Sequence, residues 1–304
     1  MLKAGLIGKP AEAGPDFSHP RFHLTGYFCP PGHGTGTEAA LAHYLPPVSN
    51  EALLLENDAL IFLYADHDMM GLITEAVKMS RHILIWNADR LDMEDIYHLI
   101  KLRDEADNVV HIRRYGRSSP LLRSSLASIS HPSLFSLKKV FTPKYQENGN
   151  PVFHRHLLTA VDALLYLCPG NIKKINTMRQ KSDMASTGLL STSLYFENGS
   201  AANLLVSDIG GEDLFVIEAY QANRLVRIDI GDQKLDVFER SSNRPVTGKN
   251  PEIPLKTAEQ ITHCELETFS MAIEGHTPSV DQLFEMARLR EICREIVERS
   301  GYTR

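Results

Sequence analysis

The chain has 304 residues, of which 43% are hydrophobic and 23% are charged. This composition is average for a globular protein and excludes a disordered or fibrous chain, and the length suits two domains with separate cores. Because 38 acidic residues outnumber 32 basic ones and the formal net charge is −6, a polyanion would be repelled, and we expect no nucleic-acid partner.

The first part of the chain alternates short apolar runs with amphipathic segments. Ser49 is a candidate N-cap, and Pro120 suits the first turn of a further helix. Strands that alternate with helices are typical of a parallel sheet. We therefore predict strands over 2–7, 22–28, 59–63, 82–86 and 108–112, and helices over 50–57, 69–80, 93–106 and 120–129.

The pattern changes after residue 130. A long periodic helix is predicted over 151–167, where Pro169 and Gly170 end it. Apolar runs separated by turn residues such as Asn198-Gly199 then predict an antiparallel sheet. Its strands are predicted over 172–180, 189–196, 201–207, 214–219, 225–230 and 235–238, followed by a flexible loop over 241–254 and helices over 258–274 and 280–300.

These elements predict an α/β protein of two domains. Residues 1–120 are expected to form a Rossmann-like doubly wound parallel sheet. Residues 121–304 are expected to form an α+β domain with a large antiparallel sheet, and its last helix could pack back on the first domain. Four widely spaced cysteines argue against a metal cluster, and no run of about 20 apolar residues is present. We expect a cytoplasmic protein with no metal site and no membrane contact.

Five segments in the right order resemble the glucose-fructose oxidoreductase and inositol dehydrogenase family, often written Gfo/Idh/MocA. They are residues 58–68 followed by 81–85, 117–120, 160–170, 196–199 and 269–275, so the resemblance spans nearly the whole chain. The resemblance implies a dinucleotide-binding domain, a substrate domain with a sheet that forms a dimer contact, and hydride transfer between a nicotinamide cofactor and a sugar or cyclitol.

The family's cofactor loop is poorly matched. Its glycine fingerprint would fall on Gly8, Pro10 and Ala13, so only the first glycine is present, and proline lacks the N–H that a pyrophosphate needs. Cys29 stands where an acidic residue should end the second strand. NAD or NADP would have to bind through Gly8, Lys9, Pro10, Tyr64 and His67. The sequence therefore assigns no cofactor and leaves NAD or NADP open, with the glycine-rich segment 32–36 as a candidate divergent nucleotide loop.

The family's proton-transfer residues are also replaced. In the family a lysine after the fifth strand, and an aspartate and a histidine on the long helix, handle the proton that accompanies hydride transfer. The lysine position falls on Asn87, the histidine position on Thr159 and the aspartate position on Arg155. None of the three is a general base at neutral pH.

Other side chains could take over part of this chemistry or bind a ligand. His156 and His67 are candidate proton carriers, although a half-buried helical histidine is the alternative reading of His156. The planar guanidinium of Arg155 could bind a carboxylate or phosphate through two hydrogen bonds, whereas most arginines on helices are solvated. Asn87, Thr159 and Arg117 are further ligand candidates, with packing, or an ion pair for Arg117, as the alternatives.

Two functions follow from the sequence. The first is a degenerate homologue without hydride transfer that acts as a ligand-binding, sensing or scaffold protein, with a sugar-like or anionic small molecule as ligand. The alternative is an NAD(P)-dependent oxidoreductase of a sugar or cyclitol-like substrate with relocated catalytic residues. In both cases we expect a homodimer formed through the C-terminal antiparallel sheet, because an apolar sheet face needs a partner.

Overall fold

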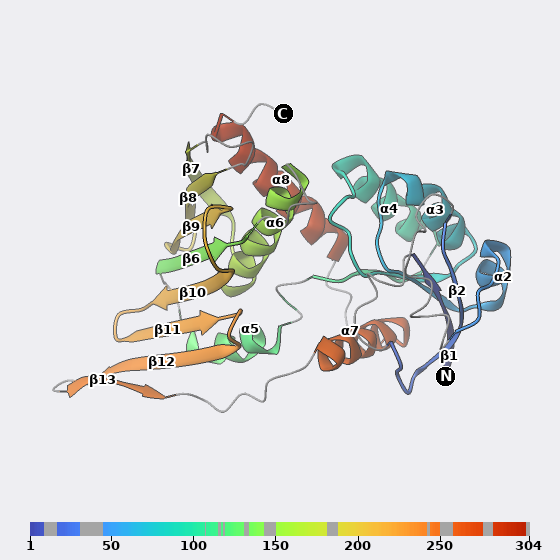
Figure 1. The fold of residues 1–304 in the computed structure, drawn as a ribbon, viewed down its shortest axis with the longest axis horizontal. Coiled ribbons are helices and arrows are strands. Elements are labelled where there is room, and N and C mark those ends of the chain that lie inside the picture. The colour runs from blue at the N-terminus through green and yellow to red at the C-terminus, as the bar shows by residue number, and fades with distance from the viewer. Residues whose placement is uncertain are drawn as a thin grey trace. The chain divides into compact units, whose positions relative to one another are not determined.

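The computed structural model describes residues 1–8, 17–30, 45–106, 108–114, 117, 119–130, 134–142, 150–180, 188–241, 244–249, 258–275 and 282–301 (Figure 1). The chain divides into two compact units. Unit 1 contains Met1–Arg113 with Lys256–Arg288, and unit 2 contains Arg114–Leu255 with Leu289–Arg304. The helix expected over 258–274 therefore belongs to unit 1. No helix in the described ranges is long and apolar enough to cross a membrane.

Unit 1 is built on a five-stranded parallel sheet in the order β2-β1-β3-β4-β5. The strands are β1 Leu2–Ile7, β2 Phe22–Phe28, β3 Ala59–Phe62, β4 His82–Ile85 and β5 Val110–Ile112. All residues of β3 are buried, as expected for a parallel strand covered on both faces. Because β1 lies between β2 and β3, the strand order reverses at β1, and ligands of such sheets bind beyond the carboxyl ends of the strands at this point.

The helices of unit 1 are α2 Asn50–Glu56, α3 Met70–Lys78, α4 Met93–Ala106 and α7 Ala258–Ile273, with the one-turn helix η2 His67–Met69 before α3. The predicted cap is confirmed, since the Ser49 hydroxyl accepts a hydrogen bond from the Ala52 N–H at 3.1 Å. A buried pair joins α7 to the sheet: His111 Nε2 of β5 lies 2.7 Å from Glu265 Oε1. Phe269 of α7 also stacks on Phe22 of β2.

Unit 2 is built on an eight-stranded sheet in the order β13-β12-β11-β10-β6-β9-β8-β7. Its strands are β6 Leu134–Val140, β7 Ile172–Gln180, β8 Leu189–Phe196, β9 Ala201–Ser207, β10 Leu214–Tyr220, β11 Arg224–Asp229, β12 Lys234–Ser241 and β13 Arg244–Lys249. Neighbouring strands are antiparallel except for β6 and β9, which are parallel. The predicted Asn198-Gly199 turn joins β8 to β9, with Gly199 at φ 84°.

Helices cover one face of this sheet (Figure 1). They are α5 Pro120–Ser125, which packs on β11 and β12, α6 Asn150–Leu167, which packs on β6 and β9, and the unit 2 part of α8 Gln282–Arg299. Side chains under the helices are buried, whereas most of their neighbours in the strands are partly or fully exposed, as in β8, where Leu194 is buried and Tyr195 is 42% exposed.

Unit 2 differs from the sequence prediction in three places. The expected flexible loop over 241–254 is wrong for residues 244–249, because they form β13 and pair with β12. Strand β6 was not expected, and the helix predicted over 120–129 ends at Ser125 and continues only as a 3₁₀ turn, Leu126–Ser128.

One buried carboxylate joins α6 to the start of unit 2. Asp162 Oδ1 accepts hydrogen bonds from the Nε atoms of Arg114 and Arg117, both at 3.2 Å, and from Nη2 of Arg114. Asp162 and Arg114 are almost fully buried, and Arg117 is partly exposed. Removing one partner of such a pair leaves an uncompensated buried charge.

We therefore expect Asp162→Asn to lower the free energy of unfolding by about 3 kcal/mol, because it leaves Arg114 without its carboxylate. Urea unfolding of the full chain measures this. Glu239→Gln is the matched control, since Glu239 forms an exposed ion pair with Arg224 at 2.7 Å, and its loss should stay below about 1 kcal/mol. Equal losses in the two variants would contradict the central role of Asp162.

Candidate functional site

The carboxyl ends of β1 and β3 hold the first group of expected site residues. Gly8 follows β1 with φ 128°, and a Cβ at this position would lie 3.0 Å from Leu63 Cβ and 3.1 Å from two ring carbons of Tyr64. Tyr64 is buried. The glycine is thus required by the close packing of the chain's own tyrosine. Lys9 and Pro10, the other expected residues of the cofactor loop, lie outside the described residues.

The position of the family's lysine lies at the end of β4. Asn87 is half-buried, and its side-chain oxygen accepts a hydrogen bond from the Asp89 N–H at 3.0 Å, which closes a local turn. The preceding residue, Trp86, is buried, with Phe17 edge-on at 4.9 Å and the Arg113 guanidinium 3.9 Å from the ring centre. This strand end therefore carries an aromatic-cation stack and a turn, and neither Trp86 nor Asn87 titrates.

His67 lies in η2, beyond the end of β3. Its side chain is 85% exposed, and Nδ1 is 3.2 Å from Asp95 Oδ1. The hydrogen bond to Asp95 and the charge of that carboxylate raise the pKa of His67 above its ordinary value. Asp95 also forms a reciprocal cap with Asp92 at the start of α4. His67 is therefore an exposed imidazole that binds a proton more readily than an ordinary histidine.

The other expected site residues lie on α6 in unit 2. The Thr159 hydroxyl donates to the backbone oxygen of Arg155 at 2.9 Å, so it is used within the helix. Arg155 and Thr159 are half-buried. Arg117 donates to Asp162 and lies over the Tyr166 ring at 5.6 Å. These contacts place Arg117 in the buried ion-pair network of α6.

His156 lies against an aromatic residue that the sequence did not single out. Its ring stacks on Phe141 with centroids 3.8 Å apart and an interplanar angle of 24°. Burial, followed by the positive charges of Lys139 and Arg155, lowers the pKa of His156 to about 4. At neutral pH the ring is therefore neutral.

Lys139 is a second residue that sequence analysis missed. Burial lowers its pKa to about 8, while Asp213 opposes the shift. Its ammonium lies 4.1 Å from the centre of the Phe215 ring, which faces Lys139 across the β6–β10 ladder. A strand assignment for 134–140 would have revealed it, because alternation puts Lys139 on the same face as Phe135 and Leu137.

The candidate residues of unit 2 are basic and aromatic. Within the described ranges, no three histidine, cysteine, aspartate or glutamate side chains are grouped so that they could bind a metal ion. Lys139 and Arg155 are cations that can bind an anion, and Asp213 is the acidic group near Lys139 and His156.

The lowered pKa of His156 predicts a pH dependence of stability. The unfolded chain, with a pKa near 6.5 for this histidine, takes up a proton before the folded chain, whose pKa is about 4, so the free energy of unfolding falls as the pH drops through this range. Because the ring is partly exposed, we expect a loss on the order of 1 kcal/mol.

Urea unfolding at several pH values between these limits tests this. His156→Gln should flatten the acid-side decrease, whereas His23→Gln, at an exposed histidine of β2, should leave it unchanged. A decrease that is identical in the parent and in His156→Gln would contradict the assignment.

No family model matches the sequence, and no curated protein matches it significantly. Comparison with solved structures gives 264 matching chains. UDP-N-acetylglucosamine 3-dehydrogenase GnnA from Acidithiobacillus ferrooxidans superposes with a TM-score of 0.85 at 18% identity, covering 99% of this chain and 98% of that chain.

Two further structures match over the same length. The dehydrogenase MviM from Clostridium difficile has a TM-score of 0.82 at 15% identity and covers 98% of this chain and 99% of that one. An oxidoreductase from Thermotoga maritima has a TM-score of 0.77 at 15% identity, with 99% and 97% covered. The structural neighbours are Gfo/Idh/MocA-type dehydrogenases, and the chain has their fold: a Rossmann-like parallel sheet followed by a large, mostly antiparallel sheet with helices.

Proposed function

We propose that this chain is a degenerate member of the Gfo/Idh/MocA fold that binds a small molecule and does not transfer hydride. The observation that carries the proposal is the contact of Asn87. The resemblance puts the proton-transferring lysine at this position, and the side chain found there closes its own turn by accepting the Asp89 N–H.

Hydride transfer from an alcohol requires a group that takes up the hydroxyl proton. An asparagine amide does not titrate, and a guanidinium group does not serve as a general base. The Thr159 hydroxyl donates to a backbone oxygen. The three family positions for proton transfer therefore supply no general base, which favours a binding, sensing or scaffold role in the cytoplasm.

The ligand we propose is sugar-like or anionic. Arg155 offers a guanidinium fork on α6, and the neighbour GnnA is named as acting on UDP-N-acetylglucosamine, a phosphate-bearing sugar nucleotide. This favours a sugar that carries a negative charge.

The second candidate is an NAD(P)-dependent oxidoreductase with relocated residues. Its support is His67, which is exposed and whose pKa is raised by Asp95, as a proton carrier near neutral pH requires. Dehydrogenases that match nearly the whole chain add to this support. His156 is the weaker carrier, because its pKa is about 4.

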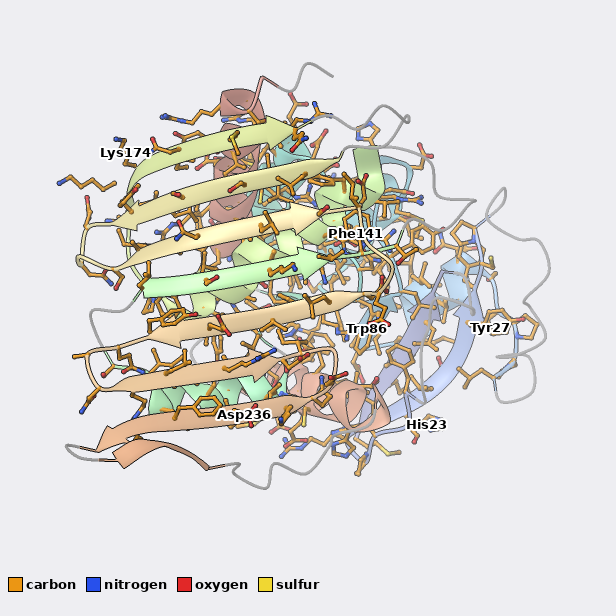
Figure 2. The ribbon with its side chains drawn as sticks, turned by 60° about the vertical axis from the view of Figure 1, so that its left-hand side comes forward. His23, Tyr27, Trp86, Phe141, Lys174 and Asp236 are labelled. Atoms are coloured by element: carbon orange, nitrogen blue, oxygen red, sulfur yellow. The ribbon has the colours of Figure 1, made fainter. Side chains whose placement is uncertain are left out.

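We also propose that two copies of the chain associate through the open face of the eight-stranded sheet, which Figure 2 shows in front of α6 and α8. Leu134, Tyr195 and Tyr220 are between 42% and 45% exposed on this face, and Met178 is 65% exposed. Tyr220, Leu225 and Phe238 line a hollow of about 400 Å³ there. Exposed apolar side chains of this kind are typical of an interface.

Calorimetric titration with NAD and NADP, each oxidised and reduced, separates the two functions. A protein without hydride transfer should give no binding heat at millimolar cofactor, whereas a GnnA-type dehydrogenase run in parallel should bind. Micromolar binding would overturn the proposal and support the oxidoreductase. If cofactor binds, His67→Gln and His156→Gln should be tested for loss of hydride-transfer activity.

Sedimentation at micromolar concentration tests the association. We expect a dimer for the parent chain and a monomer for Tyr220→Glu, because the new charge would be desolvated at the interface. Leu55→Glu is the control, since Leu55 is 60% exposed on α2 of unit 1, and it should remain dimeric. A monomeric parent chain would contradict this proposal.

A further inference from the structure

We propose that Lys139, Arg155 and His156 form a subsite for the negatively charged group of the ligand, a phosphoryl or carboxylate group. The three residues and the rings of Phe141 and Phe215 are called the Lys139 cluster below. The inference rests on the proposed ligand-binding function and names the chemistry that the ligand must carry.

The cluster is assembled from two elements. Lys139 lies next to the last residue of β6 and points to the face of the sheet that α6 covers, since Phe135 and Leu137 on the same side are buried under that helix. His156 lies in the second turn of α6 and stacks on Phe141. Phe141 follows β6 directly and is labelled in Figure 2. The backbone N–H of Phe141 is held by the oxygen of Ser207 at 3.0 Å, which fixes the aromatic ring at the strand end.

Polar atoms in the cluster lack partners from the described part of the chain. Lys139 is half-buried, and its ammonium lies against the Phe215 ring without a side-chain hydrogen bond or ion pair to the described residues. Neither ring nitrogen of His156 forms a hydrogen bond with the described residues. The ring stacks on Phe141. A partly buried ammonium and an imidazole can both donate a hydrogen bond to an anion. A bound anion would satisfy both side chains.

The electrostatics favour an anion over a cation. Lys139 and Arg155 both act on His156 as positive charges, and burial is the largest cause of the lowered pKa of Lys139 and of His156. The acidic group acting on the two is Asp213, and its Oδ1 already accepts the Thr142 N–H at 2.7 Å. Lys139 and Arg155 thus place two positive charges near His156, and a negative charge bound there would be attracted by both.

An anion would also change the protonation of His156. A negative charge beside the ring offsets Lys139 and Arg155, so the pKa of His156 should rise from about 4 on binding. Binding is then coupled to proton uptake, and the ligand should bind more tightly as the pH falls toward 5 or so.

The test uses the full chain with ¹³C-labelled histidine, observed by NMR during titration with inorganic phosphate and, separately, with acetate. His156→Gln identifies the His156 signal. We expect phosphate to shift this signal to saturation in the millimolar range and to raise the pKa of His156. Lys139→Met should weaken phosphate binding by about tenfold, since it removes one charge at a partly buried site.

Lys138→Met is the matched control, because Lys138 is the neighbouring residue on the other face of β6 and is exposed. It should bind phosphate as the parent does. A shift with acetate as well as phosphate would assign the site to anions in general, and a shift with phosphate alone to phosphoryl groups; both support the subsite. No shift with either anion at high millimolar concentration, or equal affinity in Lys138→Met and Lys139→Met, would overturn it.

The outcome is independent of the nicotinamide titration. If a cofactor binds and phosphate also shifts His156 in a Lys139-dependent way, the subsite stands and the non-enzymatic function fails. If neither cofactor nor anion binds, the subsite alone is lost, because a neutral ligand could still bind.

Discussion

Asp162 is buried in α6 and accepts hydrogen bonds from Arg114 and Arg117 at the start of unit 2. These bonds set the rotation of α6 about its axis, because any other rotation would separate a buried carboxylate from its two guanidinium groups. Thr159 and Arg155 lie about one and two turns before Asp162 on nearby faces of the helix. The side chains that α6 directs toward β6 therefore depend on this one ion-pair network.

The two groups of candidate residues have different character. At the carboxyl end of the parallel sheet in unit 1, Tyr64 packs on Gly8 and Trp86 packs between Phe17 and Arg113. Aromatic side chains of the chain itself therefore pack at the ends of these strands. In the Lys139 cluster of unit 2, the side-chain nitrogens of Lys139 and His156 form no hydrogen bond with the described residues. The anion subsite that we propose therefore lies on the sheet and helix of unit 2, whereas unit 1 supplies the parallel-sheet frame of the fold and the exposed His67.

Much of the fold was predictable because its signals are local. The strands of unit 1 are continuous apolar runs, and caps such as Ser49 and turns such as Asn198-Gly199 act within a few residues. Strand β6 was missed because its central strand position depends on partners far along the chain, β9 and β10. The sequence predicts a loop over 244–249 for the same reason: this segment, which contains a proline and a glycine, forms a strand only through its pairing with β12.

The candidate site was less predictable. Alignment identified Asn87, Arg155 and Thr159, but only coordinates show that Asn87 closes its own turn and that Thr159 donates to its own helix. Lys139 could not be recognised without the register of β6, because a lysine next to a second lysine in the sequence is ordinarily solvated. Its position opposite Phe215 and near His156 is a tertiary property.

The place of β6 in the eight-stranded sheet has a consequence for folding. Strands β7 to β9 form one meander of sequential neighbours and β10 to β13 form another, and β6 alone lies between them. The strands of each meander are neighbours in the sequence, so they can pair as hairpins. Strand β6 must close long loops to reach β9 and β10, and loop closure costs entropy before any contact forms. We expect the two meanders to form first and the single strand β6 to join them late, so that the residues of the Lys139 cluster come together only in the last step of sheet assembly.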